Sequence, residues 1–286
     1  MLGIIPIRRL LSVPYQIPTV DPNHWLARGM VGCWLPGLTY GVNLTGVVPR
    51  LLAGSVPATF AITPEGPAQS FTAQNTELKT ANLAGSGQVF PPNSSTQALT
   101  VYYRGYAIGT PQALGVFIGG TANNTNTSPF WQFYMRANNV ATLYQVGWFN
   151  SAGATNNLST GGLVSSGLIS ACTTYVPGGN INLYVNGALD ANFPIAFGGT
   201  GIWGATGNSS TSYFEIGSDD QNASRSCNSN CNMACVWNRA LSAQEVKVLH
   251  LNPYSFLIPN DVLGLMPAPP PPPAPLTASG FTWQEW

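Results

Sequence analysis

The sequence predicts an all-β protein: an antiparallel two-sheet jelly-roll sandwich with one short C-terminal helix and an extended arm at each end. Many short segments rich in β-branched and aromatic residues follow one another, separated by clusters of Gly, Asn, Ser and Pro. Only one segment carries clear helix-boundary signals, and no helices alternate with the strands, which excludes α/β architectures. With 286 residues and an apolar fraction of 44%, the chain can bury a sizeable core.

The strand segments are short, and we find no internal repeat among them. Apolar and polar residues alternate most clearly in Leu99–Arg104 and Ile181–Val185, which is typical of half-buried strands. The expected strands are Met30–Leu35, Gln69–Thr72, Glu77–Ala81, Ala98–Tyr106, Gly115–Gly119, Phe130–Arg136, Ala141–Trp148, Leu168–Tyr175, Ile181–Val185, Tyr213–Gly217 and Asn232–Trp237.

One helix is expected at about 242–251. Ser242-Ala-Gln-Glu245 has the spacing of a capping box, in which the serine side chain and the glutamate side chain each accept a backbone N–H. Leu241 and Val246 suit the accompanying hydrophobic staple. The helix must end before Asn252-Pro253, because a residue that precedes proline avoids the α region.

Three regions are expected: an N-terminal arm of residues 1–27, a β-sandwich of residues 28–257, and a spacer with a docking tail of residues 258–286. The arm is proline-rich and lacks periodicity, and Pro267–Pro275 favours a polyproline II spacer. Apolar residues in both arms are too few to form a second core, so we expect them to dock on other chains. These predicted interaction residues are Ile4, Ile5, Leu10, Leu11, Phe281, Trp283 and Trp286.

The charge content is unusually low. Charged residues make up 7% of the chain, against roughly 25% in an ordinary soluble domain. Ten basic residues balance ten acidic ones, which argues against nucleic-acid binding and against charge-driven membrane binding, since both need clustered Lys and Arg. Such a surface is typical of a protein outside the cytosol or within a permanent assembly.

The first residues make a poor secretion signal. Arg8 and Arg9 follow the short apolar run instead of preceding it, and Pro6 interrupts that run. No segment reaches the length of about 20 apolar residues that a transmembrane helix needs. A surface of extracellular type without a secretion signal is expected for a virion protein that is released when the host cell lyses.

Five cysteines are present, at positions 33, 172, 227, 231 and 235. The spacing of the last three leaves three interpretations open: a metal site, a Cys227–Cys231 disulfide, or ordinary buried thiols. Zinc sites usually need a second cysteine pair or nearby histidines, which this chain lacks. Buried thiols are therefore favoured.

Several motifs together resemble laminin-G-like modules of the concanavalin-A-like lectin fold. Three segments match in the family's order and spacing. Asn182–Gly187 and Phe214–Gly217 each resemble a strand, and Val236–Val246 resembles the last core strand with its closing helix. Gly29–Trp34 resembles the first strand. Asn252–Leu257 resembles the ending of modules that tailed bacteriophages encode. The resemblance implies a jelly roll and not a single function, since this fold hosts lectins, adhesins, glycanases and structural modules.

Calcium sites occur in relatives of this kind. The best candidate ligands here are Asp219, Asp220 and Asn222, which supply two carboxylates and an amide oxygen in one loop. No second acidic loop accompanies them, and Asp and Asn are also ordinary residues of solvated turns. We therefore expect no resident cofactor and leave calcium as the weaker alternative.

The residues do not favour an enzyme. Glycoside hydrolysis needs a pair of carboxylates, and Glu215 stands alone on its strand. A Ser–His pair is not supported either, because His24 lies in the arm and His250 lies at the end of the helix. Glycan binding remains open, because aromatic rings can stack on sugars, although Trp and Tyr on strands are more often core residues. The candidate aromatics are Trp131, Tyr134, Trp148, Trp203 and Tyr213.

The leading functional hypothesis is a bacteriophage virion structural protein, with its two arms held by neighbouring capsid or tail subunits and with a homo-oligomer expected. A decoration or cement protein on the outside of the capsid is favoured over a tail fibre, because the sequence has no heptads or repeats that would build a long stem. The alternative is a tail-associated or surface adhesin that recognises host glycans.

Overall fold

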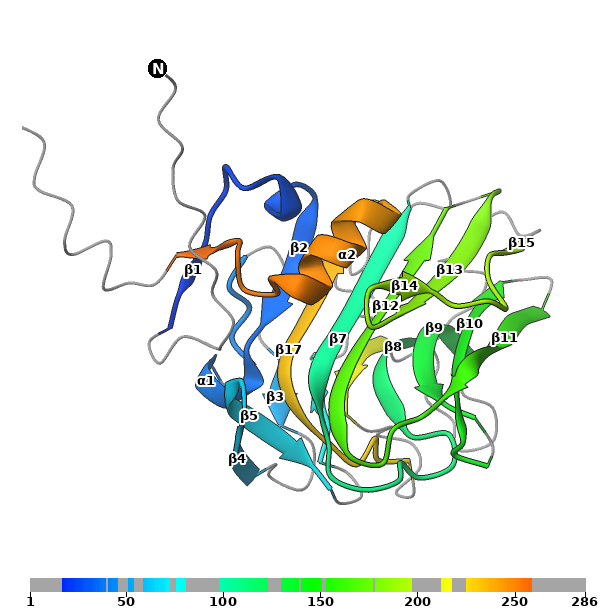
Figure 1. Ribbon diagram of the computed structural model, residues 1–286, viewed down its shortest axis with the longest axis horizontal. Coiled ribbons are helices and arrows are strands. Elements are labelled where there is room, and N and C mark those ends of the chain that lie inside the picture. The colour runs from blue at the N-terminus through cyan, green and yellow to red at the C-terminus, as the bar shows by residue number, and fades with distance from the viewer. Residues whose placement is uncertain are drawn as a thin grey trace, which may run out of the picture.

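Two antiparallel β-sheets packed face to face form the body of the protein in the computed structural model (Figure 1). The predicted two-sheet sandwich is therefore confirmed. The structure describes residues 17–39, 41–45, 51–53, 59–72, 76–80, 98–122, 130–138, 140–150, 153–176, 178–196, 212–217 and 225–258.

The larger sheet has nine strands. Seven of them follow the order β14 (Ala188–Leu189), β13 (Asn180–Val185), β12 (Gly167–Tyr175), β7 (Leu99–Ala107), β17 (Ser229–Trp237), β5 (Gly66–Phe71) and β4 (Thr59–Thr63). Of the other two, β15 (Ile195–Ala196) pairs with β13, and β2 (Met30–Trp34) pairs with β17 along the same edge that β5 uses further along the strand.

The smaller sheet has seven strands, and every pairing in it is antiparallel. Their order is β11 (Gly153–Gly162), β10 (Leu143–Asn150), β9 (Phe130–Ala137), β8 (Val116–Ala122), β16 (Ser212–Ile216), β6 (Leu78–Lys79) and β3 (Leu52–Ala53).

The main core lies between the two sheets. Tyr103 of β7 and Val236 of β17 face it from the larger sheet, and Phe117, Met135 and Phe214 face it from the smaller one. All five are buried. The period-two alternation of each strand places these residues on the inner face, so burial of apolar area holds the two sheets together.

A second apolar cluster covers the outer face of the larger sheet. Helix α2 (Ala243–Leu251) lies across β17 and β7 in Figure 1 and contributes Val246 and Leu249 to this cluster. Trp237 packs among them, and its indole N–H donates to the carbonyl of Leu26 over 2.6 Å. The central strands of the larger sheet are thus buried on both faces, which explains why β17 is buried along its whole length.

The start of α2 follows the predicted capping box. The Ser242 side chain accepts from the Glu245 backbone N–H over 3.3 Å, and the Glu245 carboxylate accepts from the Ser242 N–H over 2.7 Å. Burial raises the pKa of Glu245, but these hydrogen bonds and the ion pair with Arg239 outweigh it, so the net pKa is lowered. Leu241 and Val246 are both buried in the outer cluster, as the staple requires.

Residues 17–27 pack against the sandwich, although the sequence suggests a free arm as far as residue 27. β1 (Thr19–Val20) pairs with β18 (Leu257–Ile258), and the 3-10 turn η1 (Trp25–Ala27) buries Leu26 completely. A two-residue strand pair and one buried apolar side chain produce no periodic pattern in the sequence. The hydrophobic periodicity therefore does not predict that this segment packs on the sandwich.

Other differences from the predicted elements are local. β4 and β11 were not expected, and β11 is rich in Gly, Asn, Ser and Thr, so its strand conformation depends on pairing with β10 rather than on propensity. The four-residue helix α1 (Pro36–Thr39) was not expected either. All eleven predicted strands overlap observed ones.

The five cysteines are free thiols and are buried. Cys33 and Cys235 lie directly opposite each other on β2 and β17, with their sulfurs 3.7 Å apart. In the described ranges, no group of three or more His, Cys, Asp or Glu residues could hold a metal ion. Within the same ranges, no helix is long and apolar enough to cross a membrane.

We predict that Ser242→Ala lowers the free energy of unfolding by about 1 kcal/mol, because the third backbone N–H of α2 loses its acceptor. Chemical denaturation measures the change. The exposed Ser165 lies outside any cap, so Ser165→Ala is the matched control and should shift stability by less than about 0.5 kcal/mol. Equal effects of both changes would show that the cap does not stabilise the helix.

Candidate functional site

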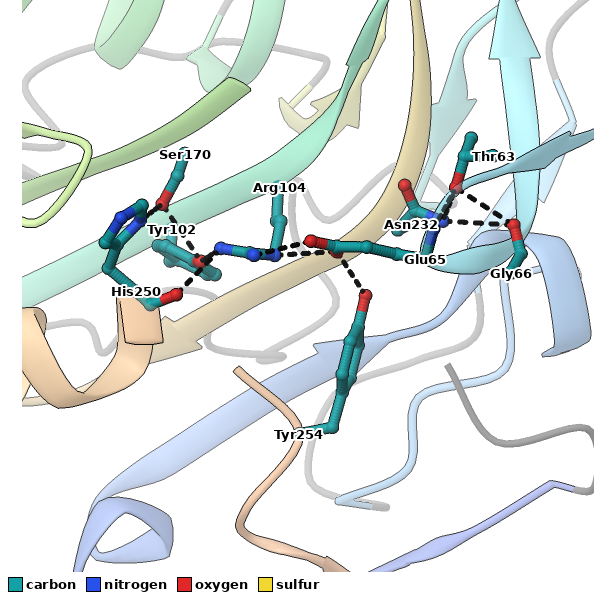
Figure 2. A network of polar contacts seen from close by, with 9 residues as sticks. All are labelled: Thr63, Glu65, Gly66, Tyr102, Arg104, Ser170, Asn232, His250 and Tyr254. Atoms are coloured by element: carbon teal, nitrogen blue, oxygen red, sulfur yellow. Dashed lines mark hydrogen bonds and ion pairs between the residues drawn. The ribbon is translucent and has the colours of Figure 1, made fainter. Parts of the chain in front are cut away.

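A buried network of polar side chains lies beneath α2, on the outer face of the larger sheet (Figure 2). At its centre, the guanidinium of Arg104, on β7, meets the carboxylate of Glu65, in the turn between β4 and β5. The Arg104 Nε and Nη2 atoms donate to the two carboxylate oxygens over 2.7 and 2.5 Å. Both residues are buried, so this is a desolvated bidentate ion pair.

Two partners of the ion pair come from the C-terminal part of the chain. The Tyr254 hydroxyl donates to the Glu65 carboxylate over 3.0 Å. Arg104 Nη1 donates to the carbonyl of His250, in the last turn of α2, over 3.1 Å. A cation is favourable there, because the carbonyls at a helix C-terminus lack partners within the helix and carry partial negative charge. The ion pair therefore ties helix α2 and the segment after it to the sheet.

A Ser–His pair does exist in the structure, although the sequence did not indicate it. The Ser170 hydroxyl lies 3.0 Å from the Nδ1 atom of His250 and 3.2 Å from the Tyr102 hydroxyl. Ser170 comes from β12, 80 residues before His250, so only the packing of α2 on the larger sheet brings them together. Ser170 is 2% exposed, which gives a substrate carbonyl no access. This geometry suits a structural hydrogen bond better than a nucleophile.

Burial shifts the pKa values of this network. It raises the pKa of Tyr102 to about 12, against the opposing effect of Arg104. Burial also raises the pKa of Tyr254, and the adjacent Glu65 charge adds to the shift. The pKa of His250 is lowered, first by burial and then by the Arg104 charge, while Glu65 opposes the shift. The tyrosines therefore stay neutral hydrogen-bonding groups at ordinary pH, and His250 favours its neutral form.

The β4–β5 hairpin is locked by a second set of contacts at the right of Figure 2. The Asn232 side-chain amide, from β17, donates to the Thr63 hydroxyl over 2.9 Å and to the carbonyl of Pro67 over 3.2 Å. The Thr63 hydroxyl donates to the carbonyl of Gly66 over 3.0 Å. Since Glu65 lies in the same turn, these bonds hold its carboxylate toward Arg104.

Pairing of β16 with β6 in the smaller sheet places Glu215 beside a lysine. Glu215 on β16 lies directly opposite Lys79 on β6, and the Lys79 Nζ atom lies 3.6 Å from a Glu77 oxygen. Both carboxylates are completely buried. Glu215 is the only carboxylate on β16, as the sequence indicates. Two buried carboxylates on either side of a lysine differ from the accessible carboxylates of a glycosidase.

Of the aromatics considered for sugar stacking, Tyr134 can be assessed directly. It is 1% exposed, and the guanidinium carbon of Arg136 lies 4.1 Å from its ring centroid. Its face is thus occupied by a cation–π contact, and the ring offers no stacking surface. The side chains of Trp131, Trp148 and Tyr213, and the whole of Trp203, lie outside the described residues.

The remaining predicted site residues also fall outside the description. These are the calcium candidates Asp219, Asp220 and Asn222 and the interaction residues Ile4, Ile5, Leu10, Leu11, Phe281, Trp283 and Trp286. The structure does fix where both arms join the domain. Thr19 lies directly opposite Ile258, so the chain enters and leaves the sandwich side by side, as Figure 1 shows at β1.

We predict that Glu65→Gln lowers the free energy of unfolding by about 3 kcal/mol, because it leaves the Arg104 charge buried without its counter-charge. Tyr254→Phe removes one hydrogen bond to the same carboxylate and should cost about 1.5 kcal/mol. Urea denaturation of both variants measures the difference. A Glu65→Gln loss no larger than that of Tyr254→Phe would contradict a central role for the ion pair.

Stability should fall as the pH drops below the ordinary histidine value of 6.5, because the pKa of His250 is lowered in the folded protein and the unfolded chain binds the proton more readily. The contribution of neutral His250 to the free energy of unfolding is present above the pKa of the unfolded chain and is lost as the pH falls. His250→Asn should flatten the dependence of unfolding free energy on pH between about 7 and 5. His24, whose pKa burial also lowers, accounts for part of the remaining slope. An unchanged slope in His250→Asn would refute the assignment.

Known proteins resemble this chain in fold. A search of curated proteins found no match. Among solved structures, the binding domain of Paraclostridial Mosquitocidal Protein 1 matches with a TM-score of 0.53 and 13% identity, over 79% of this chain and 52% of that one. Trypanosoma rangeli sialidase in complex with 2,3-difluorosialic acid matches with a TM-score of 0.56 and 14% identity, over 87% of this chain and 38% of that one.

The chain thus spans about half of the first of these structures and less of the second. At such identities the likeness concerns the fold alone. The model of one protein family matches residues 81–247 directly, which is more than half of the chain. Together with the two-sheet architecture, this match places the protein in the concanavalin A-like lectin/glucanases superfamily, as a laminin-G-type domain.

Proposed function

We propose that this protein is a structural component of a bacteriophage virion, a decoration or cement protein on the outer surface of the capsid that is held in place by its two terminal arms. The observation that carries the proposal is the common exit of both arms. Ile258 pairs with Thr19, so residues 1–16 and 259–286 attach to one place on the domain. Two tethers from one place act as a single bivalent anchor, and each raises the effective concentration of the other.

This geometry refines the expected mode of attachment. Arms that leave opposite ends of a module would strap it between two neighbours. Arms that leave together hold it by one end, and Figure 1 places β11 and β15 at the far end of the molecule from β1. A module held in this way displays its far end away from the particle.

The chemistry of the described residues supports a structural role. The buried polar side chains of this network bind one another, as Arg104 binds Glu65 and Ser170 binds His250, and they do not surround an open site. The low charge suits closely packed copies, which would repel one another if strongly charged. The resemblance of Asn252–Leu257 to modules of tailed bacteriophages supports the viral assignment. The missing heptads favour a capsid position over a tail fibre.

Deleting residues 1–16 and 259–286 together should leave the domain folded but abolish its incorporation into particles, because the retained β1–β18 pair closes the sandwich without the anchors. Circular dichroism of the deleted protein checks the fold, and mass spectrometry of purified particles counts its copies. A matched variant keeps the full length and replaces Phe281, Trp283 and Trp286 by serine, which should also reduce incorporation. Normal copy numbers of the doubly deleted protein would overturn the proposal.

A glycan-binding adhesin is the second candidate, since the chain belongs to a superfamily that is named for lectins. A glycan array and a bacterial-surface binding assay on the purified protein separate the two functions. Specific binding to one glycan class would favour the adhesin, while incorporation that depends on the arms without glycan binding would favour the structural role.

A further inference from the structure

Two of the five buried thiols touch each other across neighbouring strands. Cys33 on β2 lies directly opposite Cys235 on β17, and their sulfur atoms are 3.7 Å apart. Figure 1 shows the two strands side by side. The two cysteines are 202 positions apart in the sequence, so a bond between them joins the first strand of the larger sheet to its last strand.

The backbone around Cys33 shows which kind of strand pair the two cysteines form. The Cys33 N–H donates to the Asn43 side-chain oxygen over 2.9 Å, and the Cys33 carbonyl accepts from the Leu44 N–H over 2.9 Å. Both backbone groups therefore point away from β17, which makes Cys33 and Cys235 a non-hydrogen-bonded pair. In such a pair the Cα atoms are about 4.5 Å apart and the side chains approach closely. That separation is within the range of disulfide bonds.

The other three cysteines are held away from this pair. Cys172 belongs to the same row across the sheet, but Tyr102 of β7 lies between it and Cys235. Two strand spacings of about 4.8 Å exceed the limit of about 7 Å between the Cα atoms of a disulfide. Cys227 and Cys231 lie in the core between the two sheets, because the register of β17 shifts just after Cys231 and reverses the face of its side chains. The sheet itself separates them from the outer cluster.

We propose that Cys33 and Cys235 form a disulfide bond that fastens β2 to β17 when the chain folds in an oxidising environment. The two thiols lose two electrons and two protons, and the sulfurs move from contact to a bond of about 2.05 Å. Oxidised glutathione is a sufficient oxidant: its own disulfide bond breaks, and it takes up the electrons and protons as two glutathione thiols. Because the Cα separation of this pair already suits a disulfide, rotation of the side chains closes the gap without moving the strands.

Burial controls when this bond forms. Both side chains are completely buried. Burial raises the pKa of the Cys235 thiol well above its ordinary value, and the adjacent Cys33 adds to the shift. Thiol–disulfide exchange needs the thiolate, so the reaction is slow in the closed sandwich. The bond therefore forms while the chain folds, and the same burial then shields it from reductants.

The bond acts on the place where the N-terminal segment joins the sandwich. Residues 17–27, directly before β2, are held by the β1–β18 pair and by the buried Leu26. A covalent link at Cys33 fixes the base of this segment to a central strand. It also closes a long loop, which restricts the unfolded chain and so stabilises the folded one. This inference does not depend on the proposed viral function.

Thiol mapping tests the pairing directly. The full chain is made by cell-free synthesis with oxidised glutathione present, and the soluble protein is denatured and treated with N-ethylmaleimide to block every free thiol. Mass spectrometry of unreduced peptides should then show Cys33 linked to Cys235 and three blocked thiols. Cys33→Ala should carry four blocked thiols and no link. Cys172→Ala, the matched control from the same row of the sheet, should keep the link.

Urea denaturation tests whether the bond fits the folded sheet. The linked protein should unfold at a midpoint at least about 1 M higher without reductant than with it, because only the unreduced form keeps the long loop closed. The midpoint of Cys33→Ala should be the same in both conditions. Five blocked thiols, a link through another cysteine, or a link that leaves the midpoint unchanged would each overturn the proposal, whether or not the protein enters particles.

Discussion

The buried ion pair between Arg104 and Glu65 joins parts of the chain that no other described ion pair brings together. It connects the β4–β5 turn to the middle of β7, and through Tyr254 and the His250 carbonyl it holds helix α2 and the segment after it. The segment after α2 runs directly into β18, which pairs with β1. The position of helix α2, the exit of the arms and the setting of the β4–β5 hairpin therefore depend on one contact.

Such a contact contributes more to geometry than to stability. Removing two charges from water is costly, and a well-packed apolar pair of equal volume can be as stable. An apolar pair, however, would let the two side chains slide past each other, whereas a bidentate guanidinium–carboxylate pair has one favourable arrangement. Two hydrogen bonds restrict it further: the Tyr102 hydroxyl accepts from Arg104 Nη1 over 3.2 Å, and the Tyr254 hydroxyl donates to the Glu65 carboxylate. Burial raises the pKa of both hydroxyls, so they stay protonated. The cluster around it is otherwise apolar, so this network sets the position of the helix on the sheet.

Local sequence features predicted the local structure well. Ser242 and Glu245 cap a helix through contacts three residues apart, and β7 and β13 show their alternation directly, so each could be recognised without knowledge of the fold. The contact of Ser170 with His250 depends on where α2 packs on the sheet, and that of Glu215 with Lys79 depends on which strands become neighbours. No local pattern in the sequence records either. β11 is a similar case: its Gly- and Asn-rich sequence has weak strand propensity, and pairing with β10 determines its conformation.

The low charge and the exposed apolar residues of β4 are two aspects of the same constraint. Most soluble proteins protect an exposed strand by placing lysine on it, which makes pairing with a second chain unfavourable. This chain has ten basic residues, and one of them, Arg104, is used in the interior. With so few charges, repulsion does little to keep copies apart. If the protein is a virion component as proposed, neighbouring subunits cover its exposed apolar residues, which suits a protein within an assembly better than one that diffuses alone. The common exit of the two arms fits the same condition.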